Sequence, residues 1–291
     1  MKKIAPLFVL MAGVLWGSMG IFVRALNEEG LFSMDIVALR AIVAALSMLV
    51  FLVIFDKKLL RIKLKDIWVF LGSGIGSILF FNYCYFKAIS LTSLSLAAIL
   101  LYTAPAIVMF LSFILFNERF TGRKVIALIL TFVGCILVTG VLNDTASVTA
   151  GGILAGLGAG FGYALYSIFS RFAIERAYNS LTITFYTFLI AAFGGLFLSD
   201  RVQVAKIVLS SPDMFIFCLI FGLVCTVVPY LLYTLGLNYV ENSKASIIAS
   251  VEPVAATFIG FFVFKEKISA MGLAGMVLVL AAMFLCAEKD R

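Results

Sequence analysis

Long apolar stretches recur along this chain from one end to the other, and they constrain its fold more than any other feature. Each stretch has about 20 residues, the length that an α-helix needs to cross the hydrocarbon of a bilayer. Hydrophobic residues make up 64% of the 291 residues and charged residues 13%, which leaves little sequence for a soluble domain. The sequence therefore predicts an all-α membrane protein with ten transmembrane helices, at residues 4–25, 33–55, 67–88, 91–116, 124–142, 151–172, 181–198, 214–239, 243–264 and 270–286.

The 22 Lys and Arg residues lie mostly in short clusters between these stretches. Orientation in a membrane explains the formal net charge of +7 better than a nucleic-acid partner does, so we expect no nucleic acid. With the N-terminus in the cytoplasm, fifteen of the positive residues fall on the cytoplasmic side, including the clusters at 57–65 and 119–124. The positive-inside rule then predicts a multi-pass protein of the bacterial inner membrane with both termini in the cytoplasm.

The second half of the sequence repeats the first. At an offset of 148 residues, 82–120 aligns with 230–268 without a gap, and a Pro and a Glu keep the same spacing in both copies. Shared apolar composition does not explain that spacing, so the repeat is genuine. The matched residues include Pro105 with Pro253, Glu118 with Glu266 and Ser95 with Ser243 and, at an offset of 147, Gly13 with Gly160, Trp16 with Tyr163 and Arg24 with Arg171.

The repeat divides the chain into two halves of five predicted spans, 1–145 and 146–291. An odd number of spans places the second copy upside down in the membrane, as in transporters built from inverted repeats around a central site. The charges agree in part: Arg123 and Lys124 become Met271 and Gly272 in the second copy, whereas Lys265 and Lys267 run against the trend. We expect a 5+5 inverted repeat around a central cavity.

Short motifs in both halves carry a family resemblance. They are Trp16-Gly17-Ser18, Ala38-Leu39-Arg40, Tyr102-Thr103-Ala104-Pro105 followed by Asn117-Glu118-Arg119, and Glu252-Pro253-Val254 followed by Lys265-Glu266-Lys267. With these motifs the whole chain resembles the EamA family of the drug/metabolite transporter superfamily. The resemblance implies a 5+5 inverted-repeat transporter with a central cavity, in a family that often exports amino acids or related metabolites, and it does not fix the substrate.

Glu252 is the acidic residue placed deepest in a predicted span. It lies about 14 Å from the start of the ninth span, near the midplane of the bilayer. A carboxylate there costs several kcal/mol unless it faces a cavity, pairs with a cation or takes up a proton. We interpret Glu252 as a substrate-binding or proton-coupling group, and the alternative is a permanently neutral carboxyl that bonds a neighbouring helix.

Pro105 and Pro253 lie at matching places in the fourth and ninth spans. Neither can donate a backbone hydrogen bond, so the carbonyls of Leu101 and Ala249 lose their helical partners. The two prolines therefore mark either symmetry-related hinges and opened backbone at the cavity, or static kinks.

Arg40 lies about 10 Å inside the second span, and its counterpart in the repeat is Thr187. It is a candidate for binding a substrate carboxylate or pairing with Glu252. The alternative, which the sequence favours slightly, is that the long side chain snorkels to the outer headgroups.

Polar and aromatic residues on several spans complete the candidate site. Inside a cavity they suit an amine, an amide or a planar ring, and at the membrane edges they would be interfacial anchors, the expectation for any single tyrosine. For Glu118 and Glu266 we expect local ion pairs that fix the helix ends. The candidates for the cavity are Trp16, Asn82, Tyr85, Tyr102, Thr103, Tyr163, Tyr166, Tyr230 and Tyr233.

These features favour a secondary active transporter that exports a small amino-acid-like or related amphipathic metabolite, with protons as the candidate coupling ion. The chain has no GxxxxGK[ST] motif, so we expect no ATP-driven cycle. An importer of a cationic amine such as a quaternary ammonium is the first alternative. A membrane-embedded lipid-modifying enzyme is the second, but a chain with no His and no metal-ligand cluster offers few groups for it, and we expect no cofactor.

Overall fold

The computed structural model describes residues 2–143 and 149–287, and the predicted boundary at 145–146 lies outside them. Ten segments are long and apolar enough to span a membrane, and each lies within a few residues of a predicted span. The ten-span prediction is confirmed. The helices are α1 (Ala5–Gly17), α2 (Met19–Glu28), α3 (Ser33–Phe55), α4 (Ile67–Leu71), α5 (Phe80–Leu91), α6 (Leu94–Leu101), α7 (Ala104–Phe116), α8 (Gly122–Thr139), α9 (Ala150–Glu175), α10 (Ser180–Leu198), α11 (Arg201–Val208), α12 (Pro212–Gly222), α13 (Val228–Leu237), α14 (Asn242–Ala249), α15 (Glu252–Phe264) and α16 (Ala270–Ala287).

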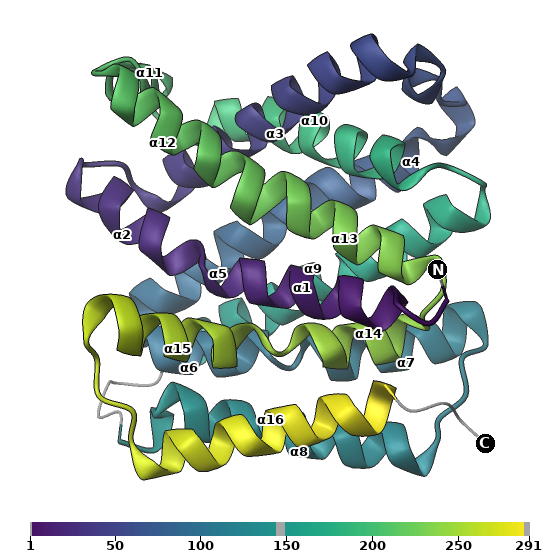
Figure 1. Ribbon diagram of the computed structural model, residues 1–291, viewed down its shortest axis with the longest axis vertical. Coiled ribbons are helices and arrows are strands. Elements are labelled where there is room, and N and C mark those ends of the chain that lie inside the picture. Colours follow the sequence, from purple (N-terminus) through teal and green to yellow (C-terminus); the bar gives the residue numbers. More distant parts are fainter. Residues whose placement is uncertain (1, 144–148, 288–291) are drawn as a thin grey trace.

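The spans run across the molecule in alternating directions, so the start of α1 and the end of α16 lie on one side (Figure 1). We call this the termini side and the other the far side. The loop with Glu118, between α7 and α8, is on the termini side, and the loop with Glu266, between α15 and α16, is on the far side (Figure 1). The two repeats therefore have opposite orientations, as an inverted repeat requires.

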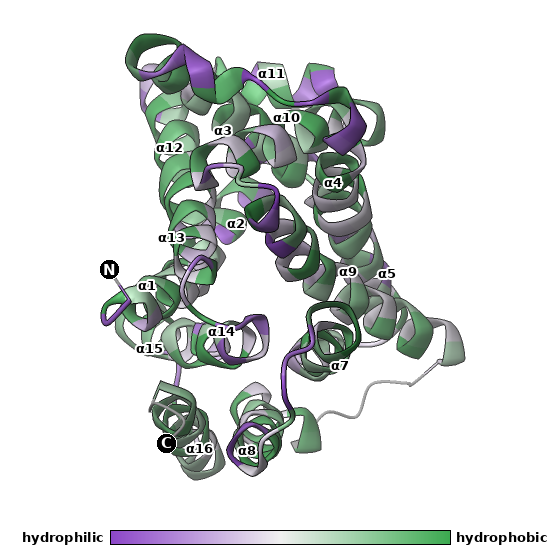
Figure 2. Cartoon of the chain, turned by 90° about the vertical axis from the view of Figure 1, so that its right-hand side faces the viewer, coloured by the Kyte–Doolittle hydropathy of each residue, from purple (hydrophilic) through white to green (hydrophobic). Residues whose placement is uncertain are grey.

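The helix surfaces that face outward are apolar. Phe55, Leu154 and Phe284 are each at least 70% exposed, which a water-soluble protein would avoid in such numbers. Polar residues gather at the helix ends and in the loops, as the colouring of Figure 2 shows. This distribution is that of a protein whose sides contact lipid.

Helices of the two halves pack against each other in symmetry-related pairs. The second span of each half, α3 and α10, pack together, and so do the fifth spans, α8 and α16. Helix α1 packs on α13, and its counterpart α9 packs on α5. Seen from the termini side, α8 and α16 lie at one edge and α3 and α10 at the other, with α1 and α9 between them (Figure 2).

The fourth and ninth spans are each broken into two helices. In the fourth span α6 ends at Leu101 and α7 begins at Ala104, and in the ninth α14 ends at Ala249 and α15 begins at Glu252. Pro105 and Pro253 occupy the second position of the new helix in each case. Proline is tolerated there because the first turn of a helix has no partner for its N–H. Both spans are therefore interrupted at the prolines, and a hinge or cavity-lining role for the two breaks stays a prediction.

Each break is contacted by a glycine from the opposite half. A Cβ on Gly13 would lie 2.7 Å from the Ala249 carbonyl oxygen, and a Cβ on Gly160 would lie 2.8 Å from the Leu100 carbonyl oxygen. These are matched glycines of the two repeats, on α1 and α9. Close approach of backbone to backbone thus holds the two breaks against the two central helices.

Candidate functional site

A small cavity lies between the central helices and is lined mainly by aromatic side chains. Trp16 is at its centre, with ring centroids 5.0 Å from Tyr230, 5.5 Å from Tyr233 and 6.3 Å from Tyr163. These distances are those of favourable aromatic pairs. The full lining is Trp16, Ser77, Ile78, Phe81, Tyr163, Tyr166, Ser167, Tyr230 and Tyr233, from four spans.

The cavity is narrow and has free hydrogen-bonding groups. Its volume is about 10 Å³, the room that one water molecule needs. Two of its polar groups, the indole N–H of Trp16 and the hydroxyl of Ser77, have no hydrogen-bond partner in the described part of the chain. Buried polar groups are normally paired, so these two are available to a bound ligand. A metabolite needs the surrounding helices to separate first.

Glu252 lies beside this cavity because the ninth span breaks just before it. As the first residue of α15 it lies at the positive end of a helix, where a carboxylate is favoured. The hydroxyl of Tyr163 donates a hydrogen bond of 3.3 Å to its Oε2, which ties it to the aromatic wall. Tyr85 and Tyr102 are close enough to interact with its charge.

Arg40 points into the protein and is only 3% exposed. Its guanidinium donates to the Asn82 side-chain oxygen at 3.3 Å and to the Met19 sulfur at 3.5 Å. The snorkelling interpretation is therefore wrong, because the side chain finds polar partners on a neighbouring span instead of the headgroups. The predicted pair with Glu252 is not among the contacts of Arg40 in the described part of the chain.

The predicted aromatic candidates fall into two groups. Trp16, Tyr163, Tyr166, Tyr230 and Tyr233 come together around the cavity, so these four tyrosines are not interfacial anchors. The remaining candidates lie elsewhere: the Thr103 hydroxyl bonds the Leu100 carbonyl, and Tyr85 and Tyr102 are outside the lining.

Sequence reasoning missed Ser77, Phe81 and Ser167 in the lining. Ser77 and Phe81 are four residues apart, as are Tyr163 and Ser167, and side chains at that spacing share one helix face. A search for polar and aromatic residues at helical spacing within the predicted spans would have found them.

Of the two expected local ion pairs, only that of Glu118 is found among the described residues, with Lys124 at 3.9 Å. Glu118 accepts hydrogen bonds from the backbone N–H groups of Asn242 and Ser243, on a different span. Glu266 forms an ion pair of 2.7 Å with Arg24, which is also distant in sequence. The expectation of a local pair is therefore wrong for Glu266 alone, because inter-span packing supplies its partner.

Comparison with known proteins agrees with this architecture. The model of the EamA-like transporter family matches the chain twice, at residues 3–140 and 150–287. The chain belongs to the EamA-like transporter family. Membership makes it a membrane transporter, and its ten spans make it a multi-pass membrane protein.

Relatives of this EamA-like transporter carry the same general description. An "uncharacterized transporter" of Archaeoglobus fulgidus is 29% identical, over 95% of this chain and 94% of its own length. The "uncharacterized transporter YwfM" of Bacillus subtilis is 25% identical, over 99% of this chain and 95% of its own length. A solved crystal structure superposes with a TM-score of 0.79 at 16% identity, covering 97% of this chain and 95% of the other, which is a likeness of fold alone.

Proposed function

We propose that this EamA-like transporter is a secondary active exporter of a small amino-acid-like or related amphipathic metabolite, driven by proton exchange through alternating access. The observation that carries the proposal is that a buried cation and a carboxyl both connect to the lining of one aromatic cavity. Arg40 connects through Asn82, which bonds the Ile78 carbonyl, and Glu252 connects through Tyr163. Intramembrane ionisable residues that face a cavity usually mark a substrate or ion pathway.

The two charged groups suit the two ends of an amino acid. A guanidinium binds a carboxylate with charge-assisted hydrogen bonds, so Arg40 is the partner for the substrate carboxylate. A carboxylate next to aromatic faces binds an ammonium group, so Glu252 with Trp16 and Tyr163 is the partner for the amine. The unpaired groups of Trp16 and Ser77 supply further contacts.

Coupling follows from competition at Glu252. A carboxyl in a water-poor site holds either a proton or the ammonium group of the substrate, because an unpaired charge there is costly. A proton that binds Glu252 from one side therefore displaces the substrate, and loss of the proton on the other side restores the binding site. Ala104, the counterpart of Glu252 in the first half, cannot share this role.

The distribution of Lys and Arg supports a bacterial inner-membrane location with the termini side in the cytoplasm. The clusters at 57–65 and 119–124 both lie on the termini side, and positive residues concentrate in cytoplasmic loops. The two matches to the family model support the division into two five-span repeats.

A cationic amine is the second candidate substrate, since the aromatic wall beside Glu252 also suits a quaternary ammonium. The buried guanidinium of Arg40 disfavours it, because a ligand without an anionic group leaves that charge without a ligand partner.

Counterflow in proteoliposomes tests the proposal. Vesicles loaded with one unlabelled compound from a panel of amino acids and amines are diluted into its labelled form, with and without an imposed pH gradient. We expect exchange of a zwitterionic amino acid, and a pH gradient to drive its net movement against its own gradient. Exchange of quaternary amines alone would favour the second candidate, and vesicles without protein provide the baseline.

A further inference from the structure

We propose that Glu118 and Glu266 are two equivalent latches that close opposite ends of the transport pathway in alternation, and that the structure has the Glu118 latch closed and the Glu266 latch open. This inference rests on the alternating access of the proposed function. It adds the residues that hold each end shut.

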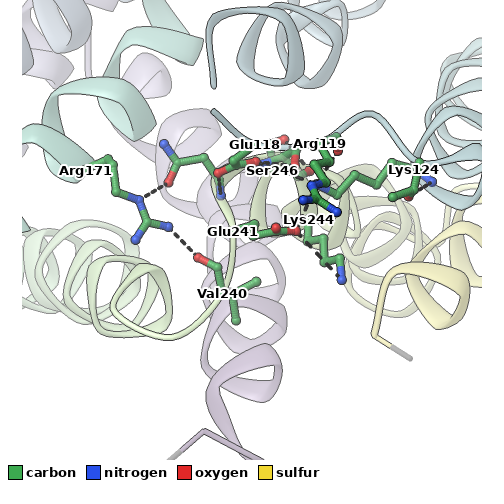
Figure 3. A network of polar contacts seen from close by, with 11 residues as sticks. Glu118, Arg119, Lys124, Arg171, Val240, Glu241, Lys244 and Ser246 are labelled. Atoms are coloured by element: carbon green, nitrogen blue, oxygen red, sulfur yellow. Dashed lines mark hydrogen bonds and ion pairs between the residues drawn. The ribbon is translucent and has the colours of Figure 1, made fainter. Parts of the chain in front are cut away.

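The Glu118 latch joins α7 to the start of α14 (Figure 3). Its Oε1 accepts from the Asn242 N–H at 2.7 Å, and its Oε2 accepts from the Ser243 N–H at 3.1 Å and from the Ser243 hydroxyl. The residue that precedes the helix, Glu241, makes no capping bond with its own side chain. The first amides of α14 therefore depend on a carboxylate from another span, in the place where a helix favours a negative charge.

Arg171 extends the latch to α9. Its Nε donates to the Asn242 side-chain oxygen at 2.9 Å and its Nη2 to the Val240 carbonyl at 2.6 Å. Asn242 in turn donates to the Ser167 carbonyl, next to the aromatic cavity. A continuous polar layer thus separates the cavity from a second pocket of about 330 Å³ on the termini side, which Glu118 and Arg171 also line.

Lys124 adds charge to this layer from α8. Its ammonium lies 2.9 Å from Glu241 and 3.9 Å from Glu118, and its side chain is only 2% exposed. Asn242 and Ser243 are completely buried. The termini side is therefore closed by a network in which four spans take part.

The corresponding residues on the far side are arranged differently. Glu266 binds Arg24, the counterpart of Arg171, and both side chains are about half exposed, at 51% and 52%. Among the described residues Glu266 makes no hydrogen bond to α6, the counterpart of α14. Leu94, which matches Asn242, is 63% exposed at the start of that helix. On the far side, Glu266 and the start of α6 are therefore not hydrogen-bonded to each other, so this latch is open.

A second matched pair gives the same result independently. Ser167 on α9 and Gly20 on α2 correspond at the offset of 147. Ser167 is 4% exposed, whereas Gly20 is exposed and a Cβ built on it would meet nothing within 4 Å. Equivalent positions of the two repeats are thus buried in the second half and exposed in the first.

In the other state of the transport cycle, the first repeat would have the arrangement that the second has here, and the second that of the first. Glu266 then binds the amides of Leu94 and Ser95 and the Ser95 hydroxyl, which the repeat retains opposite Ser243, and Glu118 releases α14. Because Gly272 stands opposite Lys124, the far-side latch lacks that cation. We therefore expect the state with the Glu118 latch closed to be the more populated one without substrate.

Cysteine reactivity in a cysteine-free background tests the latches without any transport. The reporters are Ser167→Cys for the termini side and Gly20→Cys for the far side, each combined with Glu118→Gln or Glu266→Gln and treated with a membrane-impermeant thiol reagent in detergent. Loss of a charge-assisted bond network is expected to change reactivity roughly 10-fold. Glu118→Gln should raise the rate at Ser167→Cys and lower it at Gly20→Cys. Glu266→Gln should lower the rate at Ser167→Cys and raise the rate at Gly20→Cys only slightly, because Gly20 is already exposed in the state expected to be the more populated one.

Glu29→Gln, an exposed acid at the end of α2, is the matched control and should change neither rate. Ser243→Ala is a second variant of the Glu118 latch and should change both rates in the same direction as Glu118→Gln. It replaces Glu118→Gln in the test if Glu118→Gln folds poorly. Unchanged rates, or shifts of Glu118→Gln and Glu266→Gln in the same direction, would overturn the proposal. A failure to transport amino acids would contradict the proposed function and leave these rates as they are.

Discussion

The breaks in the fourth and ninth spans share their geometry but not their chemistry. Each has a proline in the first turn of the second helix and a glycine of the opposite half packed on a backbone carbonyl at the break. Yet the ninth span places Glu252 at its break, where the fourth has Ala104. The comparison teaches that symmetry supplies the framework of the two breaks, whereas the charged residues proposed to bind and couple a substrate occur once.

The largest expected effect tests the shared geometry. Gly13→Ala and Gly160→Ala each introduce a Cβ within 2.8 Å of a carbonyl oxygen, so each should destabilise the protein by about 1–3 kcal/mol. The double variant should lose about the sum, because distant sites are usually additive. Thermal unfolding in detergent measures this, with Gly20→Ala as a control in open space. Destabilisation by only one of the two variants would show that the contacts at the two breaks are not equivalent.

The second prediction tests the unequal chemistry through Arg40 and its counterpart Thr187. Arg40→Gln removes the cation proposed to bind the substrate carboxylate, and should weaken substrate binding by about 10- to 100-fold, as expected for a bond to a charged group. Thr187→Ser keeps the hydroxyl that contacts Ser73 and should bind normally. Equilibrium binding of the amino acid found by counterflow decides this. Equal effects of the two changes on binding would show that Arg40 does not bind the substrate carboxylate.

The spans, the repeat and the two breaks could be predicted from sequence because they depend on local properties. Hydropathy indicates the length of each span. A proline in the interior of a helix kinks or breaks it, as Pro105 and Pro253 do here. The partners of Arg40 and Glu118 could not be predicted in the same way. Both residues reach across to other spans, to Asn82 and Ser243, and only the packing of helices shows which groups meet.

The smallest expected effect concerns Tyr163, which matches Trp16 in the repeat. Tyr163→Phe removes one hydrogen bond to Glu252 and keeps the aromatic wall, so exchange should slow by about 2- to 10-fold. Trp16→Phe removes an indole N–H that bonds no described residue, together with part of the ring that packs on Tyr230, so its exchange should slow at least as much. Exchange rates in proteoliposomes compare the two. An unaffected Tyr163→Phe variant would separate this hydroxyl from the function of Glu252.

Glu252 provides the most direct test, because the proposed coupling group is a carboxyl present in only one half. Glu252→Gln keeps the shape and hydrogen-bonding capacity of the side chain but cannot exchange a proton. Accumulation driven by an imposed pH gradient and exchange at equal pH are measured in the same proteoliposomes, with Glu29→Gln as the control. We predict that Glu252→Gln loses pH-driven accumulation and retains exchange. Unchanged pH-driven accumulation would show that Glu252 is not the coupling group.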